Sequence, residues 1–342
     1  MTRAIHVVNV SDAAPGWHWT GEAADGAAAG WTYVSMQRRP GLETKIKFPN
    51  LARMRGSLAV RRAVKEGRCD LLVSHGPYNS FYGAQALHRR PNPPHLAVSF
   101  NFTDIPGGMR HKLMCRAYRS VDRFVVASTM ERALYARVFD LPEERFDFCY
   151  WGVNPPIQEP LPRTIEEPYF IAIGNEARDY RPLVEAARMR PRHRFVFVVR
   201  PWTLDGLDVP DNVTVRCNLP WDETWSLVWH AAAGLISLRD RTTPNGHVSL
   251  VGGMRLGKAH IVSDSSGIAD YVIDGETALV VPTGDAQAFV QAIDRLSDEP
   301  ETMRRLGEAA QGFARRHCTE QQTVDYFSGY LADLRARGRL PA

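Results

Sequence analysis

Long apolar runs are absent from this sequence of 342 residues. No segment approaches the roughly 18 uninterrupted apolar residues of a membrane-spanning helix, and the amino-terminal apolar run of about six residues is too short for a signal peptide. Cysteine is also scarce, because the five cysteines are scattered, odd in number and without C-x-x-C spacing. This pattern argues against a disulfide framework and a zinc site. We therefore expect a cytoplasmic protein without a metal site, which can still contact a membrane surface.

An excess of charge of one sign is missing too. The 42 basic and 38 acidic residues give a formal net charge of +4, which is too balanced to indicate a nucleic-acid-binding protein. No G-x-G-x-x-G follows a predicted strand, and this disfavours a dinucleotide-dependent dehydrogenase. With 44% hydrophobic and 23% charged residues, the composition is that of an ordinary globular protein.

The order of apolar and helical patterns predicts an α/β fold. Short apolar runs that end in turn residues alternate with helical patterns, as in a parallel sheet covered by helices. The length favours two domains, and the five prolines of residues 154–168 indicate a linker. We predict two doubly wound, Rossmann-like domains that face a central cleft. The predicted boundaries are 1–154 for the first domain, 155–167 for the linker, 168–318 for the second domain and 319–342 for a C-terminal helix able to cross back to the first.

A helical pattern follows the turn formers Asn245 and Gly246. The free backbone N–H groups at this helix start favour an anion such as phosphate by about 0.3 to 1 kcal/mol, although an ordinary capped helix is the alternative. The helix also contains Gly252 and Gly253, each of which costs about 0.5 to 1 kcal/mol relative to alanine. We therefore expect either a ligand or a neighbouring strand close to that face.

Residues 252–293 closely resemble the nucleotide-sugar-binding half of GT-B glycosyltransferases, specifically the retaining enzymes of glycosyltransferase family 4. The resemblance extends more thinly over nearly the whole chain, including WGVN at 151–154 and IAIGNEARDYRPLVEA at 171–186. The positions that match the motifs of residues 252–293 are Met254, Gly257, Lys258, Ser263, Asp264, Gly267, Ile268, Asp270, Asp274, Gly275, Pro282, Gly284 and Asp285.

The resemblance implies a glycosyltransferase that uses a nucleoside-diphosphate sugar and needs no metal or other cofactor. The acceptor would be a saccharide, a lipid-linked saccharide or a small-molecule hydroxyl, and the anomeric configuration would be retained. Arg178 would act in catalysis on the leaving diphosphate. The donor-binding residues would be Gly174, Asn175, Arg181, Asn218, Leu219, Asn245, Gly246, His247, Val248, Ser249 and Gly252.

The chain departs from the family at two glutamates that usually lie eight residues apart. The corresponding positions are Pro244 and Gly252, and Asp240 or Asn245 is a candidate to replace the first. The missing carboxylates leave two alternatives open. One is a nucleotide-sugar epimerase or hydrolase of GT-B type, and the other is a non-catalytic homologue that acts as a partner protein.

On the acceptor side, His75 and Asp104 follow predicted strands and are candidates to orient or deprotonate the acceptor hydroxyl. A capping or turn role is the alternative for both. Residues 110–123 form a predicted basic amphipathic helix that fits anionic lipid or an anionic acceptor, and a solvated basic face is equally compatible. Three tryptophans recur at helical spacing, which is more typical of a core than of a sugar platform, namely Trp221, Trp225 and Trp229.

Overall fold

The computed structural model describes residues 5–12, 29–39, 41–45, 50–87 and 93–341. The chain divides into two compact units, with Met1–Cys149 and Gln321–Ala342 in unit 1 and Tyr150–Glu320 in unit 2. The division precedes the proline-rich segment, because Tyr150, Trp151 and Val153 pack against a core cluster of unit 2. None of the helices in the described residues is long and apolar enough to cross a membrane.

Unit 1 is built on a six-stranded parallel sheet with the order β2-β1-β3-β4-β5-β6. The middle strand β3 is buried along its whole length, as expected for a parallel sheet with helices on both faces. The strands are β1 (Ile5–Ser11), β2 (Ala29–Ser35), β3 (Leu71–His75), β4 (His95–Val98), β5 (Arg123–Val126) and β6 (Phe146–Phe148). The helices are α2 (Leu42–Lys45), α3 (Leu51–Lys65), α4 (Pro77–Ala86), α5 (Gly108–Tyr118), α6 (Thr129–Phe139), the 3-10 turn η1 (Glu143–Arg145) and α12 (Glu320–Ala336).

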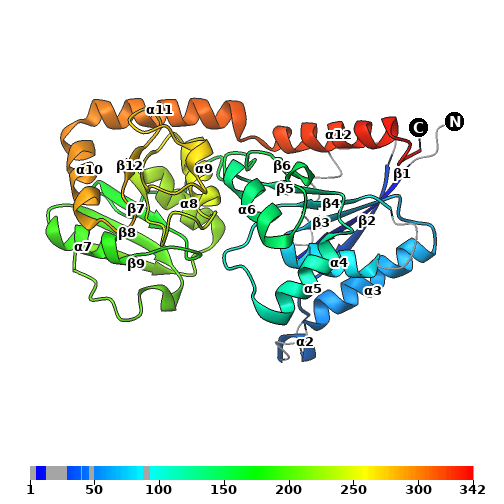
Figure 1. Ribbon diagram of the computed structural model, residues 1–342. Coiled ribbons are helices and arrows are strands. Elements are labelled where there is room, and N and C mark those ends of the chain that lie inside the picture. The colour runs from blue at the N-terminus through cyan, green and yellow to red at the C-terminus, as the bar shows by residue number, and fades with distance from the viewer. Residues whose placement is uncertain (1–4, 13–28, 40, 46–49, 88–92, 342) are drawn as a thin grey trace. The chain divides into compact units, whose positions relative to one another are not determined.

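The last helix of the chain packs on unit 1 (Figure 1). Phe327, Tyr330, Leu331 and Leu334 of α12 form one core cluster with residues of β1, β3, β4 and β5. On the other face an aromatic cluster centres on Phe100, whose ring lies 4.7 Å from that of Phe124. The two clusters bury both faces of the sheet.

Unit 2 has the strand order β12-β11-β10-β7-β8-β9, again fully parallel. Its strands are β7 (Tyr169–Ile173), β8 (Arg194–Val199), β9 (Val213–Cys217), β10 (Ala233–Ile236), β11 (Ala259–Ser263) and β12 (Leu279–Val281). Its helices are α7 (Arg181–Met189), η2 (Pro201–Leu204), α8 (Trp221–His230), α9 (His247–Arg255), η3 (Ala269–Tyr271), α10 (Ala286–Asp298) and α11 (Pro300–His317).

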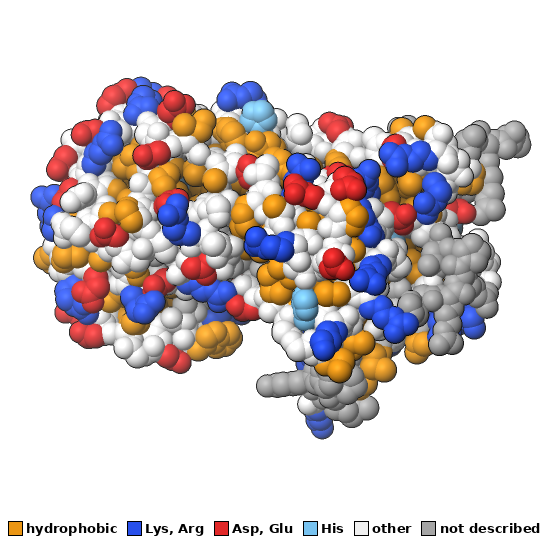
Figure 2. Space-filling view, in the orientation of Figure 1, with side chains coloured by type: hydrophobic (Ala, Val, Ile, Leu, Met, Phe, Trp, Pro, Cys, Tyr) orange, Lys and Arg blue, Asp and Glu red, His pale blue; other side chains and the backbone are white. Residues whose placement is uncertain are grey.

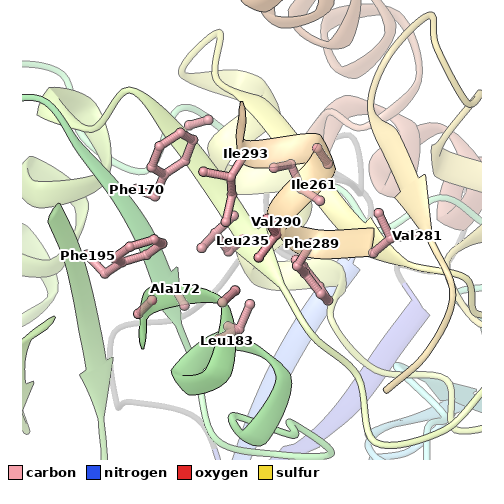
Figure 3. Packing of buried hydrophobic residues seen from close by; sticks show 14 of the residues in the cluster. Phe170, Ala172, Leu183, Phe195, Leu235, Ile261, Val281, Phe289, Val290 and Ile293 are labelled. Atoms are coloured by element: carbon pink, nitrogen blue, oxygen red, sulfur yellow. The ribbon is translucent and has the colours of Figure 1, made fainter. Parts of the chain in front are cut away.

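Large apolar side chains from the strands and from α7 and α10 fill the main core of unit 2 (Figure 3). Among them, Phe170 and Phe195 stack with ring centroids 5.9 Å apart, and Leu183, Phe289 and Ile293 cover them from the helices. The predicted α/β fold with two doubly wound, Rossmann-like sheets is confirmed. Successive strands are added on one side of β7 as far as β9 and then, from β10 on, on its other side; in unit 1 the same change of side occurs between β1 and β3. Each sheet therefore has one topological switch point.

Candidate active site

The loops that follow β7 and β10 leave the switch point of the unit 2 sheet, where doubly wound folds usually bind their ligands. Backbone hydrogen bonds tie the two loops together. The Asp179 N–H donates to the Ser237 carbonyl at 3.0 Å, and the Arg239 N–H donates to the Ala177 carbonyl at 2.9 Å. The sheet therefore places residues 174–179 beside the segment that leads into α9.

Arg178 lies at the centre of this arrangement. Its Nη2 donates to Ser249 Oγ at 2.6 Å, and the same atom lies 3.2 Å from the point that a Cβ on Gly174 would occupy. Gly174 has a φ of +108°, a conformation that glycine adopts without strain. Burial lowers the pKa of Arg178, yet the guanidinium stays charged because its ordinary pKa exceeds 12. Its Nε is buried without a hydrogen-bond partner among the described residues, so this cation keeps donors for a ligand.

The first turn of α9 adds three backbone donors. Gly246 caps the helix with a φ of +107°, and the Leu250 N–H donates to its carbonyl at 3.0 Å. The N–H groups of His247, Val248 and Ser249 have no partner in the part of the chain that the structure describes. Free N–H groups and the helix dipole attract an anion by about 0.3 to 2 kcal/mol, depending on burial. The structure thus brings the predicted residues Gly174, Arg178 and 246–249 together into one group.

The His247 side chain serves the turn rather than an anion. Its Nε2 lies 2.8 Å from the Gly267 carbonyl oxygen, and its ring packs edge-on against Tyr271. Burial lowers the pKa of His247 to about 4, so the ring is neutral near pH 7. The predicted donor contact of His247 therefore rests on its backbone N–H alone.

Two side chains were candidates to replace the first missing glutamate, and the structure separates them. Asp240 accepts hydrogen bonds from the N–H and hydroxyl groups of both Thr242 and Thr243, which help to lower its pKa to about 2. Its oxygens are thus occupied by the turn. By contrast, Asn245 Nδ2 is buried without a hydrogen-bond partner among the described residues. Asn245 is therefore the better candidate for a contact with the donor.

Neighbouring side chains explain the two glycines in α9. A Cβ on Gly252 would lie 2.0 Å from Cη2 of the buried Trp225, and one on Gly253 would lie 2.3 Å from His260 Nε2. His260 also fills the space beside Gly234, where a Cβ would lie 2.5 Å from its Cδ2. At Gly253 the expectation of a neighbouring strand is confirmed, because His260 belongs to β11. At Gly252 the close neighbour is instead the Trp225 ring of α8. The interpretation of Gly252 as a donor contact is corrected accordingly, because Trp225 occupies the space of its missing side chain.

Of the three tryptophans at helical spacing, Trp225 is the buried one, whereas Trp221 and Trp229 are exposed. The core interpretation therefore holds for Trp225 alone. Its Nε1 is buried without a partner among the described residues.

Asn175 follows β7 and Asn218 follows β9, the two strands that flank β8, and Arg200 at the end of β8 links them. Asn175 Oδ1 accepts from the Arg200 N–H and, at 2.8 Å, from Thr203 Oγ1. Asn218 has a positive φ of +54°, and its Oδ1 accepts from Arg200 Nη1 at 3.1 Å. Arg200 and Thr203 were not found from the sequence, where the only available signal was a basic residue directly after a predicted strand.

Two further predicted donor residues lie at the margin of this arrangement. Arg181 is exposed at the start of α7, and its Nη2 pairs with Asp179 Oδ2 at 2.7 Å. Leu219 is partly buried against the core cluster that contains Trp225. Neither Arg181 nor Leu219 belongs to the group of residues around Arg178.

The unit 1 sheet places His75 at its own switch point, at the end of β3. His75 is 5% exposed, and its Nε2 lies 2.8 Å from Asn9 Oδ1 at the neighbouring strand β1. Burial lowers the pKa of His75 to about 3, which makes the ring a weak base. This geometry favours an orienting role over proton abstraction.

Asp104 lies exposed in the loop after β4. That loop is anchored by the buried Glu131 of α6, which accepts hydrogen bonds from Asn101 Nδ2 at 2.9 Å, Tyr135 Oη at 3.0 Å, and the Ala127 N–H at 3.0 Å. A fourth donor is the hydroxyl of the N-cap residue Ser128. Burial raises the pKa of Glu131 to about 7. The sequence pattern Ser-x-x-Glu before a helix was a signal that could have identified this anchor.

Comparison with known proteins agrees with this architecture. A family model described as Glycosyltransferase Family 4 matches residues 8–156, and one described as Glycosyl transferases group 1 matches residues 206–313. The fold is that of the GT-B glycosyltransferases. It is shared with sucrose-phosphate synthase from Thermosynechococcus elongatus, with a TM-score of 0.78, 17% identity, and coverage of 97% of this chain and 100% of the other.

A second solved structure of the same fold is Anabaena HepE in complex with UDP-glucose. Its TM-score is 0.73 at 12% identity, with 96% of this chain and 99% of HepE covered. Among curated proteins, EpsD of Bacillus subtilis (strain 168), named as a glycosyltransferase, is 29% identical over 87 residues. That match spans 25% of this chain and only 23% of EpsD. The chain belongs to glycosyltransferase family 4, the group 1 glycosyltransferases, which are nucleotide-sugar-dependent enzymes of the GT-B fold.

Proposed function

We propose that this protein transfers a sugar from a nucleoside-diphosphate sugar to a saccharide, a lipid-linked saccharide or a small-molecule hydroxyl, with retention of configuration and without a metal. The observation that carries the proposal is that Arg178, hydrogen-bonded to Ser249 Oγ, lies beside the free N–H groups at the start of α9. HepE, which has the same fold, has been solved with UDP-glucose.

The chemistry of donor cleavage fits this arrangement. As the glycosidic bond to the diphosphate breaks, negative charge grows on the leaving oxygens, and fixed donors aimed at that charge lower the barrier. Arg178 supplies a cation whose position is set by Ser249, and α9 supplies dipoles that need no reorganisation. A bound metal would be redundant for this task, and no group of side chains in the described residues has the composition of a metal site.

Asn245 is the proposed partner of the transferred sugar in place of the family's first glutamate. Its buried Nδ2 has no partner among the described residues and is able to donate hydrogen bonds, whereas a carboxylate only accepts them. The sugar would therefore present an acceptor oxygen at this point. The ribose-holding carboxylate has no replacement at Gly252, because Trp225 fills that space.

On the acceptor side, we assign contact with the acceptor hydroxyl to Asp104, which is exposed. His75 would act by orienting the loop residues that follow β3, since Asn79 Nδ2 donates to its carbonyl at 2.8 Å. The assignment of Asp104 predicts that the Asp104→Asn variant loses turnover, while its dissociation constant for the donor stays close to that of the wild type.

The structure ends the predicted helix 110–123 at Tyr118, and Arg123 already belongs to β5. Within this segment, α5 is proposed to rest on an anionic membrane. Exposed apolar side chains recur at four-residue spacing at Ile105, Met109 and Leu113, beside the exposed Arg110 and Lys112. Figure 2 shows basic and hydrophobic side chains close together over the part of unit 1 that carries α5. Apolar insertion flanked by cations is the pattern of an interfacial helix.

The membrane proposal is tested by sedimentation with anionic and neutral vesicles. The paired variant Met109→Ala, Leu113→Ala should lose binding to anionic vesicles. The matched control is Met54→Ala, Leu58→Ala on α3, which removes an exposed Met and an exposed Leu at the same four-residue spacing. Equal loss in both pairs would overturn the assignment to α5.

Isothermal titration with UDP, GDP and ADP tests the donor site directly. We expect at least one of them to bind with a one-to-one stoichiometry and the Arg178→Gln variant to bind it more weakly. If none of the three binds the wild-type chain, the proposal fails. Proton NMR of the product formed from a bound donor then reads the anomeric configuration.

Two alternatives are kept because both family glutamates are missing. A nucleotide-sugar epimerase or hydrolase would consume the donor with no acceptor present. A non-catalytic partner protein would turn over no donor, and Gly246→Val would change complex formation without abolishing sugar transfer by the active partner. Donor consumption with and without acceptor separates these three functions.

A further inference from the structure

A hollow of about 340 Å³ lies in unit 1, where the carboxyl-terminal part of α12 meets the start of β5. It lies at the amino ends of the strands, whereas His75 and the loop with Asp104 follow the carboxyl ends. The residues that line it come from the β5 and β6 region and from α12 and the turn after it. They are Arg119, Ser120, Val121, Asp122, Arg123, Glu144, Arg145, Tyr330, Asp333, Leu334, Arg337 and Arg339.

Five of the residues that line this hollow are arginines and three are carboxylates. Arg339 pairs with Asp122 at 3.3 Å, and Arg337 pairs with Asp333 at 2.8 Å. Arg145 is different, because its Nη2 donates to two backbone carbonyls, at 3.0 and 3.2 Å. No carboxylate forms an ion pair with it among the described residues. Arg119 and Arg123 pair with Asp140 and Asp147, which lie outside the lining, at 3.2 and 3.7 Å. Arg145 is therefore the arginine of the lining whose charge is not paired with a carboxylate among the described residues.

Arg145 is held rigidly in place. Besides the two carbonyls, its guanidinium carbon lies 5.7 Å from the centre of the Phe124 ring. Burial lowers the pKa of Arg145, but the side chain remains protonated at any physiological pH. A fixed, partly desolvated guanidinium with spare N–H donors is well suited to a phosphate or carboxylate group.

Tyr330 provides an independent indication of a ligand. The residue is 7% exposed, it lines the hollow, and its hydroxyl is buried with no hydrogen-bond partner in the described part of the chain. Its pKa is raised by burial, so the hydroxyl keeps its proton and can donate it to an acceptor. A buried hydroxyl without a hydrogen-bond partner is destabilising, and a bound anion that accepts a hydrogen bond from it would remove this penalty.

We propose that this hollow is a second binding site, for a small phosphorylated anion. Its volume is at the lower end of the range for small-molecule sites, which is about 300 to 1,000 Å³. Arg145 and Arg339 would bind the phosphate oxygens, and Tyr330 would donate a further hydrogen bond. Because α12 contributes Tyr330 and the turn after it contributes Arg337 and Arg339, the ligand joins the end of this helix to the body of unit 1. Binding therefore stabilises the docking of α12 on unit 1.

The test uses inorganic diphosphate as the probe, titrated calorimetrically into the full chain. The Arg178→Gln background weakens the proposed donor site, so that binding at the hollow is measured by itself. We expect one remaining site in this background. Adding Arg145→Gln and Arg339→Gln should raise its dissociation constant at least 100-fold, since each charge-assisted hydrogen bond contributes about 10- to 100-fold in affinity.

The matched control is Arg335→Gln, which removes an exposed arginine of α12 that does not line the hollow. Tyr330→Phe keeps the buried ring and should weaken diphosphate binding about tenfold. Hydrogen exchange of the α12 amides should slow when diphosphate is added, in the wild type and in Arg335→Gln. If the Arg178→Gln background binds no diphosphate, or if Arg335→Gln weakens it as much as Arg145→Gln does, the second site does not exist.

Discussion

Replacing Gly252 by alanine should destabilise unit 2, although the change improves helix propensity. In a helix interior alanine is favoured over glycine by about 0.5 to 1 kcal/mol. The added Cβ would, however, lie 2.0 Å from Trp225 Cη2 and 2.6 Å from Cζ3. Trp225 is 2% exposed and packed among Tyr169, Ile171 and their neighbours, so the ring has little room to move. Overpacking of this kind costs about 1 to 3 kcal/mol or more, and we expect a net loss of about 1 to 2 kcal/mol.

The assay is urea unfolding followed by circular dichroism and by tryptophan fluorescence, because five of the eight tryptophans, Trp225 among them, belong to unit 2. Gly329→Ala is the matched control, because Gly329 also lies inside a helix but has no atom within 4 Å of its added Cβ. This variant should gain about 0.5 to 1 kcal/mol. If Gly252→Ala is as stable as Gly329→Ala, the packing argument is refuted.

A double-mutant cycle identifies the partner. Trp225→Leu should cost about 2 to 4 kcal/mol by itself, because it leaves a cavity beside α9. In its presence Gly252→Ala should cost nothing or become stabilising, which gives a coupling of about 1 to 3 kcal/mol. Simple additivity would show that Trp225 does not restrict position 252. The same logic predicts that Gly252→Glu, which restores the family residue, unfolds unit 2 rather than improving nucleotide binding.

Three further outcomes are expected. Arg178→Gln should weaken binding of the nucleoside diphosphate about 10- to 100-fold. Arg181 is exposed and paired with Asp179, so Arg181→Gln should change this binding less than threefold. Equal effects of the two variants would contradict the central place given to Arg178. Sugar transfer should be unchanged by EDTA, and a loss that added Mg²⁺ or Mn²⁺ restores would overturn the metal-independent proposal. The third concerns Glu131, whose pKa is raised by burial from 4.5 to about 7. A carboxyl that binds a proton more tightly when folded adds stability below about pH 4.5, and that contribution is lost as the pH rises through 7. The loss amounts to about 3 kcal/mol for unit 1, and Glu131→Gln should flatten urea stability between pH 5 and 8; an unchanged slope would count against the raised pKa.

Much of the fold could be predicted from local patterns. The apolar runs at residues 70–76 and 95–102 predict two strands and contain the buried parallel strands β3 and β4, because period and length are properties of the chain itself. The helix start at Gly246 could also be predicted, since glycine and asparagine mark a turn wherever they occur. Among the site residues, Arg178 was placed beside Ser249 only by the pairing of β7 with β10, which brings together residues 71 positions apart.

Other features depended on contacts that no local pattern encodes. Burial keeps His75, a candidate to orient or deprotonate the acceptor, and His247, a candidate donor contact, as neutral rings held by hydrogen bonds. Asp240 and Asn245 were equivalent candidates in the sequence, and the turn that occupies Asp240 separates them.

The sequence by itself determined the alternation of strands and helices, the turn before α9 and the family, because these depend on residue type and spacing along the chain. Only the tertiary structure decided the meaning of Gly252. A mid-helix glycine indicates a close neighbour without identifying it, and the neighbour is a tryptophan 27 positions earlier in the chain. The indole ring of Trp225 thus occupies the space beside Gly252 where the family usually has a carboxylate.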